Sequence, residues 1–192
     1  MRHSAIYVGV LLFATGGVGC SRIQPTNPTL KTTETQDPED WLDATKQAYR
    51  SGDVEVRVTG ARFGQPRVRD VRSGEQPPAG NLLIVYFEIK NNSRTKKNSH
   101  LSWAKADGHF VARLQDEKSN GYARHAFIYC GEVDGVKTTD REIQPGGTDR
   151  DLVAFDVPIA KVTTLRLSLP GMQIGQQGSV QFKIPVGMVE RK

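Results

Sequence analysis

Cysteine is scarce in this chain, with Cys20 and Cys130 the only two among its 192 residues. A framework of several disulfides, which many small secreted domains need, is therefore excluded. If Cys20 is modified in another way, Cys130 has no partner within the chain. We interpret Cys130 as a buried and unreactive thiol on a strand; the alternatives are an exposed thiol that joins two copies, and a nucleophile.

Long apolar runs are also missing near the N-terminus. The apolar stretch at residues 5–14 is about half the roughly twenty residues that a membrane-spanning helix needs. Arg2 precedes it, and small residues follow it up to Cys20. A positive start, a short apolar stretch and a small-residue region are the parts of a secretory signal peptide. We predict that residues 1–19 are such a signal and are removed.

The residues that end this segment resemble a lipobox, the motif at which signal peptidase II cleaves so that an acylated cysteine becomes the new N-terminus. Gly17 stands where leucine is commoner, three positions before Cys20. We predict lipid attachment at Cys20, with ordinary secretion as the alternative. The protein is then expected in the cell envelope, anchored to the outer or inner membrane by its lipid and facing the periplasm or the exterior.

Catalytic and metal-binding spacings are lacking as well. After removal of the signal, His100, His109 and His125 are the remaining histidines, and no two have the close spacing of a zinc site. No serine stands between spaced glycines as in a nucleophile turn. We predict that the chain is not an enzyme and needs no cofactor or metal. The alternative is an envelope hydrolase or metal-binding protein whose site is assembled only in three dimensions.

Acidic residues gather around the turn at residues 145–147. They are Asp140, Glu142, Asp149 and Asp151. Arginines interrupt them, and the alternating oxygen ligands of a calcium loop are absent. We interpret them as solvated turn charges.

Charge is unevenly distributed. The formal net charge is +5, and the basic residues concentrate after residue 53. Arg67, Arg69 and Arg72 are candidate contacts to an anionic ligand, because Arg67 and Arg69 lie on one side of an extended segment and guanidinium groups bind phosphate in pairs. The alternative is that these charges only discourage pairing between exposed strand edges. Nucleic acid is not the expected partner, because no stacking aromatics alternate with the charges.

Residues 20–51 divide into two parts. Residues 20–37 contain prolines and polar residues with little apolar content, which predicts a lipidated, disordered tether. Asp37 and Pro38 are typical of a helix start, and apolar residues then recur at helical spacing until Gly52. We therefore predict a short helix over residues 38–51 that packs on the following domain through Trp41 and Tyr49.

The period changes to two at Val54, which predicts strands over residues 52–190. The alternation slips at Gly60, where we expect a bulge. Residues 82–89 are apolar on both faces, which predicts a central strand. Further strands are expected at residues 99–103, 109–114, 126–130, 152–157, 165–169 and 180–184. Asp134-Gly135 is one of the turn signals that separate them. About seven to eight strands without helices between them indicate an all-β fold, an antiparallel β-sandwich.

A resemblance covers most of the chain after the tether. It rests on Trp41, residues 44–52, 54–58, 82–93, 102–103, 143–146, 151–158, 165–170 and 182–185. These landmarks resemble an exported, planctomycete-type family of bacterial lipoproteins of unknown function, whose domain is similar to telokin-like, immunoglobulin-type domains. The resemblance implies an immunoglobulin-like sandwich with Trp103 as its core tryptophan, but without the inter-sheet disulfide of antibody domains. It implies no catalytic residue, because the landmarks are turn and core positions.

These expectations combine into one hypothesis. The chain is a lipid-anchored envelope protein that acts as a non-catalytic protein-interaction or structural module. Its partners are the membrane, through the lipid, and another envelope protein, with no small-molecule substrate evident. Binding of anionic lipid or wall polymer through the basic loop that carries Arg67, Arg69 and Arg72 is a further alternative.

Overall fold

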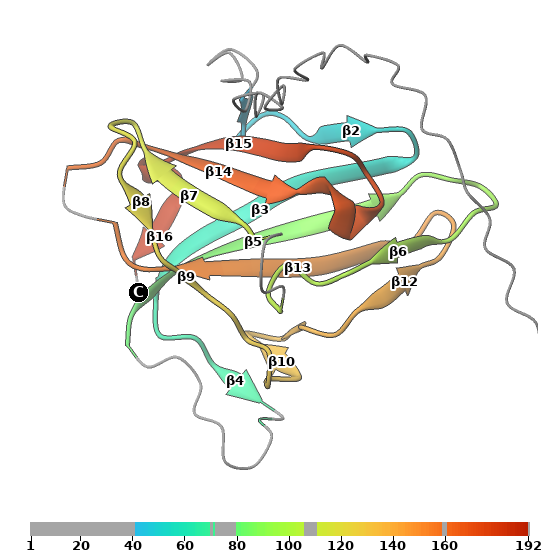
Figure 1. The fold of residues 1–192 in the computed structure, drawn as a ribbon, viewed down its shortest axis with the longest axis horizontal. Coiled ribbons are helices and arrows are strands. Elements are labelled where there is room, and N and C mark those ends of the chain that lie inside the picture. The colour runs from blue at the N-terminus through green and yellow to red at the C-terminus, as the bar shows by residue number, and fades with distance from the viewer. Residues whose placement is uncertain (1–40, 70, 72–79, 106–110, 159–160, 192) are drawn as a thin grey trace, which may run out of the picture. The chain divides into compact units, whose positions relative to one another are not determined.

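The computed structural model describes residues 41–69, 71, 80–105, 111–158 and 161–191. The predicted signal peptide, the predicted tether with Cys20, and the residues Arg72 and His109 lie outside this part. The regular elements within it are strands and two short 3-10 helices (Figure 1). In the described residues no helix is long and apolar enough to cross a membrane.

Two sheets make up most of the fold. The larger has the order β16 (Val189–Arg191), β3 (Val54–Gly64), β5 (Leu82–Asn91), β13 (Thr148–Phe155) and β9 (Arg124–His125), with β2 (Tyr49–Ser51) also paired to β3. The other has the order β1 (Leu42–Asp43), β15 (Ser179–Pro185), β14 (Thr164–Pro170), β7 (Arg113–Asp116) and β8 (Gly121–Tyr122). The pairing is antiparallel except where β1 joins β15 and β16 joins β3.

The inner faces of the two sheets enclose one hydrophobic core. Phe87 of β5, Leu167 of β14 and Phe182 of β15 meet there, together with Trp103. Trp103 has no exposed surface, and its ring packs edge-on against Phe87 at a centroid distance of 5.5 Å. The predicted β-sandwich and the predicted core tryptophan are thus present in the structure.

A second core lies on the outer face of the larger sheet. A small sheet covers this face, with the order β11 (Val136–Lys137), β10 (Glu132–Val133) and β4 (Val68–Arg69). Alternate side chains of β5 therefore enter different cores: Leu83 and Val85 face inward, whereas Leu82 and Ile84 face the second core. This explains why residues 82–89 are apolar on both faces, and β5 pairs with both β3 and β13 as a central strand should.

The slip in the alternation is a real irregularity of β3. Its register against β5 shifts between Val58 and Gly60. An extra residue at this point turns Ala61 toward the inner core in place of residue 60.

The expected helix is wrong for residues 41–51, and residues 38–40 lie outside the described part. Residues 41–51 form β1, a turn and β2 instead. The Asp43 carboxylate accepts hydrogen bonds from the amide and hydroxyl of Thr45, which makes a turn that competes with a helix. A helix this short is marginal in water, so pairing of β1 with β15 and of β2 with β3 prevails.

Residues 126–130, expected as a strand, are another correction. They form a turn between β9 and β10. Phe127 and Cys130 are apolar because the turn enters the second core, and Phe127 N–H donates to Ala104 O at 2.9 Å. Cys130 is buried as predicted, but it is not on a strand. The described strands also exceed the expected seven to eight, because many of them are only two or three residues long.

Candidate functional site

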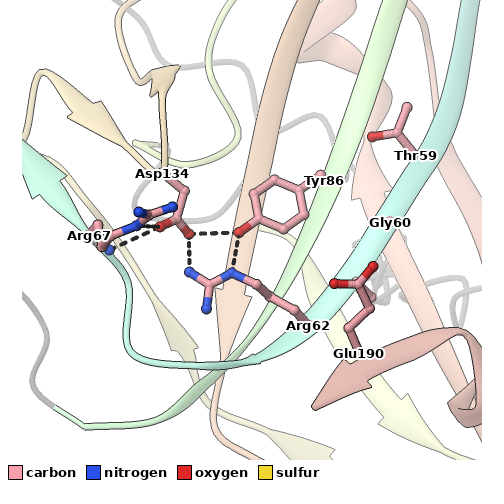
Figure 2. Close-up of a pocket in the computed structure, with 8 residues that line it drawn as sticks. Thr59, Gly60, Arg62, Arg67, Tyr86, Asp134 and Glu190 are labelled. Atoms are coloured by element: carbon pink, nitrogen blue, oxygen red, sulfur yellow. Dashed lines mark hydrogen bonds and ion pairs between the residues drawn. The ribbon is translucent and has the colours of Figure 1, made fainter. Parts of the chain in front are cut away.

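A polar cluster joins the small sheet to the larger one (Figure 2). Asp134 and Gly135 form the two-residue turn between β10 and β11, and both have positive φ angles, 51° and 80°. A hairpin turn of this type requires such angles, which Asp and Gly tolerate better than other residues. The sequence signal for this turn was therefore correct, and the turn places the Asp134 carboxylate over the outer face of β5.

The Asp134 carboxylate is held by three groups from separate segments. Tyr86 of β5 donates its hydroxyl to Oδ2 at 2.6 Å, and the amide of Arg67 donates to Oδ1 at 3.0 Å. Arg62 of β3 donates Nη2 to Oδ2 and Nε to the Tyr86 hydroxyl, the latter at 2.8 Å. Burial alone would raise the pKa of Asp134, but these hydrogen bonds outweigh it and hold that pKa below its ordinary value. The ionised Asp134 carboxylate therefore links the small sheet to the larger one.

An open pocket of about 300 Å³ lies beside this cluster. Figure 2 shows Glu190 and Thr59 on its other side. Arg62 and Asp134 neutralise each other, and Glu190 offsets the charge of Arg67. This pocket therefore has no net charge that would select an anion.

Two of the predicted anion contacts, Arg67 and Arg69, lie in different surroundings. Arg67 enters the cluster through its backbone, while its side chain remains 88% exposed and Nε lies 3.8 Å from Asp134. Arg69 of β4 is 79% exposed and lies 3.8 Å from Glu132. Exposed pairs at such a distance contribute little to stability. Arg69 lies on β4 and Arg67 immediately precedes that strand, and both guanidinium groups remain open to solvent.

A second cluster is built around His100, which ends β6 (Asn98–His100). The imidazole has no exposed surface, and its Nδ1 lies 2.8 Å from Asp149 while its Nε2 lies 3.1 Å from Asp151. β6 pairs with β12 (Arg141–Ile143), and Arg141 also binds Asp149 through Nε at 2.7 Å. Both imidazole nitrogens face carboxylate oxygens, an arrangement that favours the doubly protonated imidazolium form of His100.

The electrostatics of this cluster follow from that geometry. Burial disfavours a charged imidazole, yet the hydrogen bonds to Asp149 and Asp151 outweigh it and raise the pKa of His100. Burial also acts against ionised Asp149, but hydrogen bonds from His100 and Arg141 lower its pKa to about 2. The interpretation of these acidic residues as solvated turn charges is therefore wrong for Asp149 and Asp151, because β13 carries both against β6.

The geometry around His100 is not that of a nucleophile and its base. Ser102 donates its hydroxyl to Asp151 at 2.8 Å and not to His100. His125 binds Asp156 at 2.7 Å, and burial raises the pKa of the Cys130 thiol, which disfavours the thiolate. His100 contacts Asp149 and Asp151, His125 contacts Asp156, and Cys130 lies in the second core, so the three residues have different neighbours. Among the residues that it describes, no His, Cys, Asp and Glu group is arranged to hold a metal.

Sequence reasoning missed both clusters as units. Asp134 is 72 positions from Arg62 and 48 from Tyr86. His100 is 49 positions from Asp149 and 51 from Asp151. The only usable signals were local, namely the Asp134-Gly135 turn and the acidic residues near the turn at 145–147.

The His100 cluster predicts how stability depends on pH. The raised pKa of His100 means that its contribution is complete below about pH 6.5 and is lost as the pH rises through that pKa. The lowered pKa of Asp149 means that its contribution is present above about pH 4 and is lost as the pH falls toward 2. We expect the free energy of unfolding, measured by urea denaturation, to be largest between these limits and to decline as the pH rises above about 6.5.

The surface histidine supplies the control for this pH profile. The variant His125→Gln should keep the decline above pH 6, whereas His100→Gln should flatten it. Parallel profiles for the protein and His100→Gln would contradict the assignment.

Comparison with known proteins gave distant similarities in structure. No family model matches this chain, and no curated protein matches it. The resemblance to an exported lipoprotein family therefore stays a hypothesis. The solved structures similar to it include YjhA of Bacillus subtilis, with 9% identity, 78% of this chain and 99% of that chain covered, and a TM-score of 0.47. They also include YcdA of Bacillus subtilis, a candidate lipoprotein, with 14% identity, coverage of 72% and 38%, and a TM-score of 0.43. A third is an uncharacterised β-sandwich protein of Clostridium difficile, with 10% identity, coverage of 72% and 89%, and a TM-score of 0.42.

Proposed function

We propose that this chain is a lipid-anchored cell-envelope protein whose immunoglobulin-like sandwich is a non-catalytic protein-interaction or structural module. The observation that supports the absence of catalysis best is the state of His100. A general base needs an accessible nitrogen with a lone pair, and His100 is fully buried with both nitrogens bonded to carboxylates. Its proton stabilises the fold and is not available for transfer to a substrate.

The two polar clusters have a structural task that suits a binding module. His100 and Arg141 fasten β6 and β12 to β13, and Asp134 fastens the small sheet to β3 and β5. Binding surfaces carried on elements that are held in this way lose little conformational entropy when a partner docks. Short strands at the sheet borders, such as β8 and β16, offer backbone groups to a partner strand.

The anchor is supported by the sequence before residue 41. The apolar stretch, the small residues and Cys20 predict acylation, and the proline-containing segment after it predicts a spacer between lipid and domain. A basic domain near an anionic bilayer gains about 1 kcal/mol for each suitably placed Lys or Arg.

The mass of the mature protein and its partitioning with membrane proteins test the predicted lipid anchor at Cys20. Intact mass spectrometry of the protein from its own cells is expected to show a chain that starts at Cys20 and carries acyl groups. Detergent phase separation should place it with membrane proteins, and the Cys20→Ala variant should lose both the added mass and the partitioning. An unacylated chain in the culture medium would contradict the anchor. Crosslinking in intact cells, with Cys20→Ala as the control, then identifies the envelope partner.

A further inference from the structure

Two hollows at one end of the sandwich share Asn81, which immediately precedes β5. One has a volume of about 360 Å³ and is lined mainly by apolar side chains; the other has a volume of about 320 Å³ and is lined by polar and basic ones. Because Asn81 lines both, the two hollows adjoin. An apolar hollow next to a basic one is the arrangement that an amphiphile with a negative head would fit.

The apolar hollow lies where the two sheets part. Phe63 at the end of β3 packs against the inner core, and Val162 and Val186 come from segments next to β14 and β15. Val157, which follows β13, is 44% exposed and lines the same hollow. Covering these side chains with an apolar ligand removes their surface from water, which is favourable in proportion to the area buried.

The charged side chains that the structure describes in the lining of this hollow are positive. Lys161 and Arg191 are its charged lining residues in the described part of the chain. The guanidinium of Arg191 lies over the Phe63 ring, 5.9 Å from its centroid. An apolar ligand with a negative group is therefore favoured over a neutral one.

The basic hollow contains two guanidinium groups that are positioned in different ways. Arg62 is fixed through Nε and Nη2, and no hydrogen bond within the described residues uses its Nη1. A Cβ at Gly64 would lie 2.7 Å from that nitrogen, so the glycine makes room for the guanidinium. Arg67 is held by its backbone, with its exposed side chain only weakly paired. Gln65 and Asn81 add two carboxamides. Asp134, which pairs with Arg62, and Glu190 line the neighbouring pocket and not this hollow, so the open guanidinium edges of Arg62 and Arg67 face it without a carboxylate among the described lining residues.

We propose that the two hollows form one binding site for an anionic lipid with a single acyl chain and a phosphate head. The phosphate binds Arg62 and Arg67, which suit its geometry because guanidinium groups donate paired hydrogen bonds to phosphate oxygens. The acyl chain lies along Phe63, Val157 and Val186. Each volume is near the lower end of the range for ligand pockets, roughly 300–1,000 Å³, which favours one chain over two. This site goes beyond the proposed function, because it requires neither the anchor nor a protein partner.

Titration calorimetry with three soluble probes tests the site. The protein is the full chain with Cys20→Ser, so that its own lipid is absent, and each probe is used below its micelle concentration. Lauroyl lysophosphatidate is expected to bind. Glycerol 3-phosphate, which has only the head, and monolaurin, which lacks the phosphate, should each bind at least about tenfold more weakly. Equal affinity for lysophosphatidate and either of the other probes would overturn the proposal.

Matched variants locate the binding. Arg67→Gln should weaken lysophosphatidate binding by about tenfold, the loss of one charge-assisted contact, and Val157→Asp should weaken it by at least as much. Arg113→Gln and Met172→Asp change an exposed arginine and an exposed apolar residue elsewhere and should leave it unchanged. Thermal melting confirms that each variant is folded. Unchanged affinity in Arg67→Gln and Val157→Asp, or an equal loss in the control variants, would overturn the site. So would a leucine-terminated peptide that binds as tightly, since it would assign the hollow to a protein partner.

Discussion

Replacing His100 with alanine is expected to lower the free energy of unfolding by about 3–5 kcal/mol, the usual cost of removing one partner from a buried ion pair. The substitution leaves Asp151 wholly buried without its cationic partner and frees Asp149 on one side. It also opens a cavity beside Trp103, whose ring lies 5.7 Å from the imidazole. Urea denaturation followed by circular dichroism measures the change.

Two further variants separate charge from packing. His125→Ala removes a partly exposed histidine that pairs with Asp156, and the expected change is below about 1 kcal/mol. Adding Asp151→Asn to His100→Ala should recover part of the lost stability, because the uncompensated buried charge disappears. A loss below about 1 kcal/mol in His100→Ala would show that the cluster does not hold β6 to β13.

Replacing Trp103 with alanine is the second large loss that we expect, again about 3–5 kcal/mol. The indole is fully buried between the sheets, and its Nε1 donates to Pro170 O at 3.1 Å. The substitution removes the contact with Phe87 and leaves the Pro170 carbonyl without this donor. Thermal or urea unfolding, followed by circular dichroism because one of the two tryptophans is lost, measures the effect.

The other tryptophan is the natural control. Trp41 is only half-buried, so Trp41→Ala should cost clearly less than Trp103→Ala. Equal losses would contradict the placement of Trp103 at the centre of the core. Because Trp103 and His100 are in contact, their combined substitution should not be additive.

The sequence predicted the parts of this fold that depend on neighbouring residues. The run at residues 82–89 indicated a central strand, the slip at Gly60 indicated a bulge, and Asp134-Gly135 indicated a turn, and all three are present. The helix over residues 38–51 failed where the structure describes it because helical spacing is a weak preference that strand pairing overrides. The strand at residues 126–130 failed because an apolar run does not tell a strand from a buried turn.

The candidate sites also combine local features, which the sequence shows, with contacts that only the assembled sheets create. Arg67 and Arg69 were recognisable as a basic segment, but their neighbours were not, because Arg62, Tyr86 and Asp134 meet only once β3, β5 and the β10–β11 turn are assembled. His100 gave no sign of its two carboxylate partners for the same reason.

By itself the sequence determined that this chain folds into strands with turns at definite residues, and it supplied the cysteine on which the predicted anchor depends. Side-chain periodicity depends only on neighbouring residues, so it can be recognised in the sequence without knowing which strand is the partner. Only the tertiary structure decided which charges are buried and paired, which arginines remain open to solvent, and that an apolar hollow adjoins a basic one. Those properties arise from contacts between residues far apart in the sequence, such as Arg62 and Asp134 at 72 positions, and such contacts exist only once the strands have paired in a defined register.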